Sequence, residues 1–307
     1  MPASRSHDLQ WSPLPGRIAL VSPASAVAED VLEATLRQLE VLGIDYSLGS
    51  HAQARYRYLA GTPAQRLEDF HQAFEQDDIH AVWCLRGGYG CAQLIDGLDW
   101  ERLRSASRRP LIGFSDISIL LSAFHRHGLP ALHASVASAL GLQPLSAPNE
   151  QRERLASLAS VSRVLAGDSR SLPVSHLYGP TQPVQGPLIG GNLTALASVA
   201  GTAAALHAPA GAILILEDVG EPYYRLERSL WQLLHSGVAS QLGAVVLGTF
   251  TDCPRKNVAH SLEEIVIEYL KPLGIPLYHG LPSGHGAHNR AWPYGEVAQL
   301  QANGLSW

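Results

Sequence analysis

The chain has 307 residues, of which 46% are hydrophobic and 16% charged, and its formal net charge is −5. A chain of this length usually forms more than one hydrophobic core, so two domains are expected. No segment approaches the roughly 20 apolar residues that span a bilayer, and a negative chain without a basic run argues against nucleic-acid binding.

The N-terminal residues and the cysteines bear on cellular location. Residues 1–16 lack the apolar stretch of a secretory signal, and the first hydrophobic run, Ile18–Val21, has the size of a strand. Cys84, Cys91 and Cys253 form no disulfide framework, which is typical of a reducing compartment. We therefore expect a cytoplasmic protein.

The first half of the chain alternates strand-like and helix-like segments. Strands are predicted at 18–22, 44–48, 81–85 and 111–114, and helices at 28–42, 63–76 and 116–127. Such alternation is typical of a parallel sheet with helices on both faces.

The character of the sequence changes between residues 144 and 187. An amphipathic helix is predicted at 151–165, and Gly, Ser and Pro crowd residues 167–187. We interpret residues 146–180 as the connection between an N-terminal domain, 1–145, and a C-terminal domain, 181–307. The second half has predicted strands at 212–216, 244–248 and near 276–278, helices at 224–235 and 261–270, and short strands around the Asn303-Gly304 turn.

A serine follows the predicted strand at 111–114 almost directly. In Gly113-Phe114-Ser115-Asp116 the chain passes from strand to helix without a loop, which is the layout of a nucleophile elbow. The free N–H groups and the dipole at the helix start would favour an oxyanion. Ile117 replaces the second glycine of G-x-S-x-G. Because Ser and Asp are also favoured helix caps, capping is the alternative role of Ser115.

A glycine-rich segment, Arg86-Gly87-Gly88-Tyr89-Gly90, follows the predicted strand at 81–85. Adjacent glycines let the backbone approach a ligand or present an N–H to a developing negative charge. The segment does not fit the dinucleotide fingerprint, because the third glycine is missing. An ordinary tight turn is the alternative.

An acid and a histidine loop complete the candidates in the second half. Glu217 ends the aliphatic run 212–216, at the strand end where α/β sites form, and its neighbour Asp218 could serve as well. A turn or cap before the next helix is the alternative role. Loop residues 279–290 are rich in glycine and contain His279, His285 and His288. Loops often carry functional groups, so one of these histidines is a candidate base.

Metal and thiol chemistry are the competing classes. Histidines gather at 125–133 and at 285–288, but neither group shows H-E-x-x-H or an acid at ligand spacing. Cys84 lies in an apolar run, and neither it nor Cys91 stands at an elbow. We expect no metal and no cofactor.

Together these segments resemble the LD-carboxypeptidase family of serine peptidases. The resemblance rests on motifs in the family's order across nearly the whole chain: Leu85–Gly90, Gly113–Asp116, Gly190–Leu193, Leu216–Asp218 with Glu221–Tyr223, and Ser283–His285. The chain departs from the family pattern at His133-Ala134-Ser135, where His-Gly-Pro is expected, and this bears on the pocket wall.

The resemblance implies an α/β protein with two domains. The N-terminal domain would be flavodoxin-like, with a parallel sheet that carries the nucleophile elbow. The C-terminal α/β domain would have a β-rich, barrel-like core, and the protein would be a homodimer. Members of the family release the terminal D-alanine from cytoplasmic murein tetrapeptides, at the L,D bond after meso-diaminopimelate. A serine carboxypeptidase of peptidoglycan recycling is therefore the expected function.

The resemblance also implies a catalytic triad of Ser115, Glu217 and His285. His285 would accept the serine proton, Glu217 would orient the imidazole, and water would resolve an acyl-enzyme. The backbone N–H groups of Gly88 and Asp116 are the candidates for the oxyanion site.

A carboxypeptidase also needs a cation for the terminal carboxylate of its substrate. A bidentate guanidinium suits this role. Three arginines lie near the motifs, namely Arg86, Arg225 and Arg290.

Two other functions stay open. A related branch of the family inactivates peptide-nucleotide antibiotics of the microcin C type, and such an amidase would share the triad. A non-enzymatic α/β binding protein would explain the glycine loops with Ser115 as a cap. A serine-directed probe that labels nothing would favour the binding protein.

Overall fold

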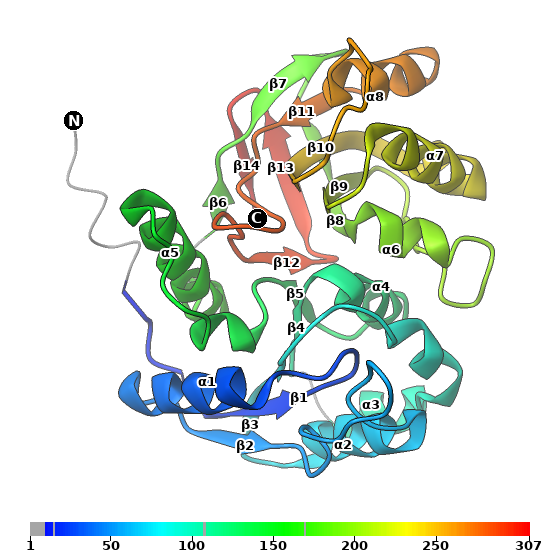
Figure 1. Cartoon of the computed structure of the whole chain (residues 1–307). Coiled ribbons are helices and arrows are strands. Elements are labelled where there is room, and N and C mark those ends of the chain that lie inside the picture. Colours follow the sequence, from blue (N-terminus) through cyan, green and yellow to red (C-terminus); the bar gives the residue numbers. More distant parts are fainter. Residues whose placement is uncertain (1–9, 15, 107–108, 169) are drawn as a thin grey trace.

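The computed structural model describes residues 10–14, 16–106, 109–168 and 170–307. Two β-sheets form its framework, and Figure 1 shows the first below the second, with helix α4 and the edge strand β12 of the first sheet at their junction. Within the described ranges, no helix is both long and apolar enough to cross a bilayer.

The first sheet is built mainly from the first half of the chain. Its strands are β1 (Arg17–Val21), β2 (Tyr46–Leu48), β3 (Ile79–Cys84), β4 (Leu111–Gly113), β5 (Ala131–His133) and β12 (Trp292–Tyr294). Their order is β12-β5-β4-β3-β1-β2, with β1 to β5 parallel and β12 antiparallel to β5. The order β2-β1-β3-β4-β5 is that of flavodoxin, so the predicted fold class of this part is confirmed.

Helices cover both faces of the first sheet, as predicted. Helices α1 (Glu29–Val41) and α5 (Pro148–Leu165) pack on one face, and α2 (Pro63–Glu75), α3 (Trp100–Ala106) and α4 (Ser118–Arg126) on the other. Successive strand residues point to opposite faces. Leu20 and Trp83 accordingly pack with α1 and α5, whereas their neighbours Val21 and Cys84 pack with the second group.

The second sheet has eight strands. They are β6 (Ser171–Leu172), β7 (Ser175–Tyr178), β8 (Val184–Asn192), β9 (Ala212–Val219), β10 (Leu242–Thr251), β11 (Leu277–His279), β13 (Val297–Gln301) and β14 (Gly304–Ser306). Their order is β6-β14-β13-β8-β9-β10-β11-β7, in which β8 to β11 are parallel and the outer pairs antiparallel. The apolar run of β9 is buried at the centre.

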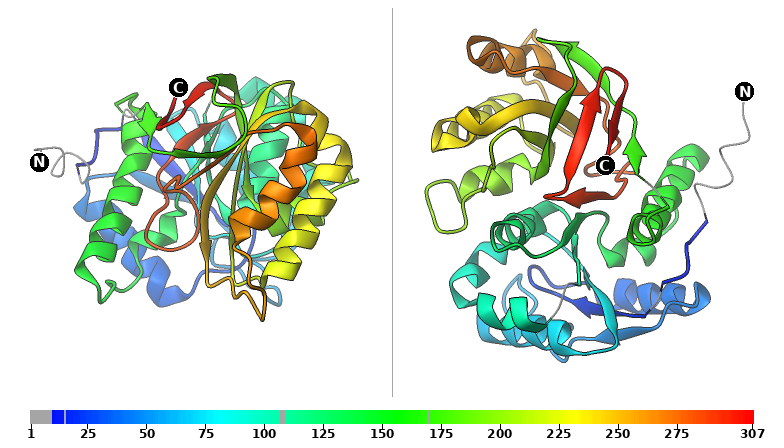
Figure 2. Two further views of the ribbon diagram at one scale, coloured as in Figure 1. Left: turned by 90° about the horizontal axis from the view of Figure 1, so that it is seen from above. Right: turned by 180° about the vertical axis from the view of Figure 1, so that it is seen from behind.

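The second sheet curls on itself. Strands β6 and β7 stand at its opposite edges, yet only residues 173–174 separate them in the chain. The backbone N–H of His176 in β7 donates to the carbonyl of Ala302, in the turn between β13 and β14 (2.8 Å). Helices α6 (Leu193–Ser198), α7 (Tyr223–Leu233) and α8 (Leu262–Leu270) run along one side, as Figure 2 shows. The predicted β-rich, barrel-like core is confirmed.

Most predicted elements agree with the structure to within three residues, but some strands are missing from the prediction. The sequence predicts no strand between residues 167 and 192, where the structure has β6, β7 and β8. Strand β8 is not recognisable from the sequence because it contains several glycines. The packing of the sheet requires glycine at position 190, since Gly190 has φ +123° and a Cβ there would lie 1.9 Å from the carbonyl oxygen of Ile215 in β9. The last hairpin turns at Ala302-Asn303, one residue before the predicted turn.

The division into residues 1–145, 146–180 and 181–307 stays a prediction. Strand β12 comes from the third of these segments and completes the first sheet. Helix α5 comes from the second segment and covers one face of the same sheet. At the junction, the hydroxyl of Ser118 at the start of α4 accepts a hydrogen bond from the backbone N–H of Asn192 at the end of β8 (3.1 Å).

Candidate active site

Ser115, His285 and Glu217 form one chain of hydrogen bonds. The Oγ of Ser115 is 3.1 Å from Nε2 of His285, and Nδ1 of His285 is 2.7 Å from Oε2 of Glu217. The Glu217 side chain is completely buried, and that of His285 is 20% exposed. With the Nδ1 proton donated to the carboxylate, Nε2 has a free lone pair for the serine proton. The structure thus brings together three side chains that the sequence places on different halves of the chain.

The backbone at Ser115 has the shape of a nucleophile elbow. Strand β4 ends at Gly113, and Ser115 has φ +64°, a left-handed conformation that costs a non-glycine residue about 1–2 kcal/mol. A 3₁₀ turn, Ser115–Ile117, then leads into α4, and no side-chain cap bond starts either helix. A Cβ at position 113 would lie 2.8 Å from Ile117, so the turn requires glycine there. Among the described residues, Ser115 therefore caps no helix.

The glycine-rich segment lies directly against the elbow. A Cβ at Gly87 would lie 2.9 Å from the Cβ of Ser115, and one at Gly88, where φ is +106°, would lie 2.4 Å from the hydroxyl oxygen of Ser25. The carboxylate of Asp116 accepts a hydrogen bond from the backbone N–H of Cys91 (2.9 Å). Burial raises the pKa of Asp116. The close backbone approach that the glycines suggested is present beside the serine.

The backbone N–H groups of Gly88 and Asp116, which are the candidates for the oxyanion site, belong to residues next to the contact between Gly87 and Ser115. Within the described part of the chain, neither the N–H of Gly88 nor that of Asp116 donates a hydrogen bond to another residue. Both donors are therefore available to a ligand at the elbow. Their role stays a prediction.

Hydrogen bonds connect the histidine loop, residues 279–290, to the end of β10. The carbonyl oxygen of His285 accepts hydrogen bonds from the hydroxyls of Thr251 (2.6 Å) and Thr249 (3.2 Å). Its backbone N–H donates to Oε2 of Glu217 (3.1 Å), so this carboxylate oxygen binds His285 twice. Gly284 has φ +136°, and a Cβ there would lie 2.4 Å from the Thr249 hydroxyl. Sequence reasoning missed both threonines, although they follow the predicted strand 244–248.

Asp218 and His288, which the sequence offers as alternatives to Glu217 and His285, make other contacts. Asp218 accepts hydrogen bonds from the amide of Asn192 (3.1 Å) and from the backbone N–H (2.9 Å) and hydroxyl (2.7 Å) of Thr194, at the start of α6. Neighbouring residues of a strand point to opposite faces, so Asp218 is turned away from the serine. His288 is half exposed and pairs with Glu153 (3.4 Å).

Aromatic rings pack behind the imidazole of His285. The ring centroid of Phe114 is 4.8 Å from that of His285, and His133 stacks on Trp292 at 4.6 Å. Burial lowers the pKa of His133 to about 3, so this imidazole is neutral. His133 itself agrees with the family pattern, and the departure lies at the next two residues, Ala134 and Ser135. Of the other clustered histidines, His127 stacks on Trp100 instead.

Over the described ranges, no group of three or more His, Cys, Asp or Glu side chains is arranged to hold a metal ion. Cys84 and Cys91 are buried, and burial raises the pKa of both thiols.

The three candidate arginines differ in their surroundings. The guanidinium of Arg290 donates to the carboxylate (2.8 Å) and the carbonyl (2.9 Å) of Glu153, and its side chain is 17% exposed. Arg225 is exposed and pairs with Glu221 (3.4 Å). Arg86 is exposed and donates to the carbonyl of Ala26 (2.8 Å).

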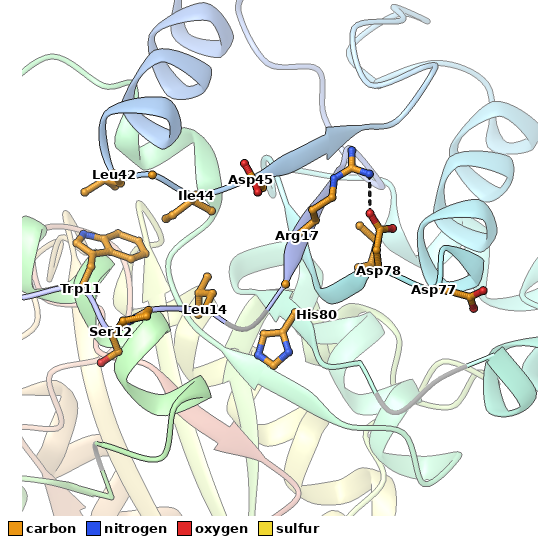
Figure 3. A pocket seen from close by; sticks show the side chains of 14 residues that line it. Trp11, Ser12, Leu14, Arg17, Leu42, Ile44, Asp45, Asp77, Asp78 and His80 are labelled. Atoms are coloured by element: carbon orange, nitrogen blue, oxygen red, sulfur yellow. Dashed lines mark hydrogen bonds and ion pairs between the residues drawn. The ribbon is translucent and has the colours of Figure 1, made fainter.

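A separate cavity of about 750 Å³ lies at the other end of the first sheet. Figure 3 shows its lining, with Trp11 and Leu14 near the start of β1 and an exposed ion pair between Arg17 and Asp78. These residues precede or begin β1 and β3, whereas Ser115 follows the carboxyl end of β4. Active sites of open α/β sheets lie at the carboxyl ends, so this cavity is distinct from the triad.

Comparison with known proteins gives consistent matches over the whole chain. The profile of the LD-carboxypeptidase N-terminal domain matches residues 18–134, and that of the LD-carboxypeptidase C-terminal domain matches residues 185–300. The murein tetrapeptide carboxypeptidase of Pseudomonas aeruginosa is 71% identical over 307 residues, which cover 100% of both chains. The probable murein peptide carboxypeptidase of Bacillus subtilis is 30% identical over 92% of this chain and 88% of its own.

Solved structures match equally broadly. The muramoyltetrapeptide carboxypeptidase from Oxalobacter formigenes has a TM-score of 0.80 at 27% identity, over 94% of this chain and 96% of its own. The microcin C7 self immunity protein has a TM-score of 0.84 at 19% identity, over 96% and 97%. The second likeness concerns the fold alone.

Proposed function

The chain belongs to the LD-carboxypeptidase family, and on this premise we propose that it releases the terminal D-alanine from murein tetrapeptides. It is a serine-type carboxypeptidase, a hydrolase of murein peptides. The observation that carries the substrate assignment is the 71% identity, over the full length of both chains, to a murein tetrapeptide carboxypeptidase. The hydrogen-bonded series Ser115, His285 and Glu217 supports the catalytic assignment.

The reaction follows from the chemistry of these three groups. Ser115 Oγ attacks the carbonyl carbon of diaminopimelate while Nε2 of His285 takes its proton. Glu217 stabilises the imidazolium that forms. The imidazolium then protonates the amine of D-alanine as the C–N bond breaks, and an acyl-enzyme remains. Water, deprotonated by His285, hydrolyses this ester and regenerates the serine.

The tetrahedral intermediate needs donors for its oxyanion. The backbone N–H groups of Gly88 and Asp116 are assigned this role, because they flank Ser115 and make no other hydrogen bond in the described part of the chain. Loss of one such donor typically raises the barrier by about 3 kcal/mol.

A panel of four peptides tests the substrate assignment. L-Ala-γ-D-Glu-meso-diaminopimelyl-D-Ala should release D-alanine. The L-alanine-terminated analogue and the D,D bond of the pentapeptide should react at least about a hundredfold more slowly, because misplacing the reacting atoms by about 1 Å costs that much. The C-terminal amide should also lose kcat/KM, since a cation would be left unpaired.

Released alanine is measured by chromatography with purified protein. Ser115→Ala protein, purified identically, controls for contaminating peptidases. Equal rates for the L- and D-alanine termini would remove the L,D-specificity while leaving the serine peptidase in place.

Arg86, Arg225 and Arg290 are the candidates for binding the terminal carboxylate, and the contacts of Arg290 and Arg225 predict different phenotypes for their variants. Arg290→Gln breaks its bonds to Glu153 and Ser157. We expect it to lower the free energy of unfolding by about 1–2 kcal/mol, a decrease of several degrees in Tm. Arg225→Gln, on a side chain 52% exposed, should leave Tm unchanged.

Thermal unfolding and the ratio of kcat/KM for the acid and amide substrates are measured together. Loss of the acid preference in Arg290→Gln at unchanged Tm would assign this arginine to the substrate instead.

Location and assembly belong to the same proposal. We place the enzyme in the cytoplasm, where three cysteines without a disulfide are usual, and we propose a homodimer. Light scattering after size-exclusion chromatography measures the assembly directly.

Two alternative functions, an amidase and a binding protein, have less support. The likeness to the microcin C7 self immunity protein rests on 19% identity and concerns the fold, so no amidase activity is proposed. Comparison of D-alanine release with cleavage of an aminoacyl-sulfamoyl adenylate distinguishes the two substrates. A purely binding role does not fit membership of a peptidase family.

A further inference from the structure

Two exposed tyrosines and an exposed arginine gather beside the elbow and take no part in the chemistry described above. We call Arg57, Tyr58 and Tyr89 the tyrosine rim. Tyr58 is 57% exposed and Tyr89 is 49% exposed. Their rings meet edge to face with centroids 5.7 Å apart, and the guanidinium carbon of Arg57 lies 5.6 Å from the Tyr58 centroid.

The tyrosine rim lies on the same sheet edge as Ser115. Its residues come from the segments that follow β2 and β3, and Ser115 comes from the one that follows β4. The strand order reverses between β1 and β3, which is where open α/β sheets bind ligands. Gly87 touches Ser115, and Tyr89 is only two residues, or at most about 7 Å of chain, farther along.

Backbone hydrogen bonds hold the rim in place. Tyr56 and Leu59 exchange both backbone hydrogen bonds (3.0 Å each) around the two-residue turn Arg57-Tyr58. The N–H of Tyr89 donates to the hydroxyl of Ser25 (3.2 Å), and Arg86 donates to the carbonyl of Ala26 (2.8 Å). The backbone of the rim is thus already ordered, so binding does not have to order it.

Arg57 occupies a backbone position that suits glycine. Its φ is +58° at the first central residue of the turn, where tight hairpin turns favour Gly, Asn or Asp. Arginine is less stable than glycine in this left-handed backbone conformation, and such local strain is typical of functional sites. In this conformation the guanidinium lies beside the exposed rings of Tyr56 and Tyr58.

We infer that the tyrosine rim is a subsite for the acyl part of the substrate, which takes the α-carboxylate of the γ-linked D-glutamyl residue on Arg57. This rests on the proposed function. A carboxypeptidase that removes one alanine has a one-residue leaving side, so the rest of the peptide extends on the acyl side. Guanidinium groups bind carboxylates through paired N–H donors, and aromatic faces accept the neighbouring methylene groups. D-Glutamate is the first residue before diaminopimelate on the acyl side of the scissile bond.

A pair of substrates isolates this contact. One tetrapeptide carries D-glutamate and the other D-isoglutamine, in which an amide replaces only the α-carboxylate. Wild-type protein should prefer the first by about tenfold in kcat/KM, as expected for one charge-assisted hydrogen bond. Arg57→Gly should reduce this preference to about one.

Arg57→Gly is chosen because glycine adopts φ +58° without strain, so its Tm should not fall. Arg37→Gln is the matched control. It removes the same charge from a side chain 64% exposed on α1, and should keep the wild-type preference.

Three results would overturn the inference. They are a wild-type enzyme that does not distinguish the two peptides, a full preference retained in Arg57→Gly, and an equal loss in Arg37→Gln. In each of these, D-alanine release by the wild-type protein would leave the proposed function standing. If wild-type protein released no D-alanine from either peptide, both the function and the subsite would fall.

Discussion

Replacing Ser115 by alanine should lower kcat/KM for D-alanine release by at least about a thousandfold. The alanine variant has no nucleophile, and the rate that remains would come from substrate binding and the oxyanion donors alone. His285→Ala should be similarly severe, because without the base the serine hydroxyl is a weak nucleophile at neutral pH. The double variant should be little worse than either single one, since residues that act as a unit are not additive.

The controls concern folding and the choice of serine. Ser115→Ala keeps a β-carbon at φ +64°, so its Tm should stay close to that of the wild type. Ser105→Ala removes an exposed hydroxyl that donates only to the carbonyl of Arg102 on α3, and should retain full activity. More than about a tenth of the wild-type kcat/KM in Ser115→Ala would show that another group is the nucleophile.

The nucleophile could be predicted from sequence because its signal is local. A buried strand, a glycine, a serine and a helix follow one another within a few residues, and the structure turns this order into the strained conformation at Ser115. The choice between Glu217 and Asp218 was not local. Both end the same strand, and only the packing of β9 against its neighbours decides which one faces His285. For this reason the sequence left the pair open, and family resemblance supplied Glu217.

The supports of the site were harder to foresee. Thr249 and Thr251 hold the His285 carbonyl from 34 to 36 residues away in the chain, and no pattern in one sequence predicts such a contact. Strand β12, only three residues long and containing Pro293, joins a sheet whose other strands lie more than 150 residues earlier. Long apolar strands such as β3 and β9 were predicted because burial on both faces leaves a continuous hydrophobic run.

Replacing Glu217 by glutamine should lower kcat/KM by about 10³–10⁴ with little effect on folding. In the wild type, Oε2 of this carboxylate accepts both the side-chain and the backbone N–H of His285 (2.7 and 3.1 Å). An amide fills the same buried space but carries no charge to stabilise the imidazolium. If its NH₂ group faces Nδ1, the imidazole must carry its proton on Nε2 and cannot accept one from Ser115.

Two further variants separate charge, reach and position at residue 217. Glu217→Asp keeps the charge but shortens the side chain by one methylene, so it should lose less activity than glutamine if charge dominates. Asp218→Asn changes the neighbouring carboxylate, which accepts hydrogen bonds from Asn192 and Thr194. This variant should lower Tm and leave kcat/KM close to the wild-type value. Single-turnover rates and thermal unfolding are measured for all three. A glutamine variant within tenfold of wild-type kcat/KM, correctly folded, would mean that His285 works without a charged partner, and Glu217 would then serve only to hold the loop through its bond to the His285 backbone.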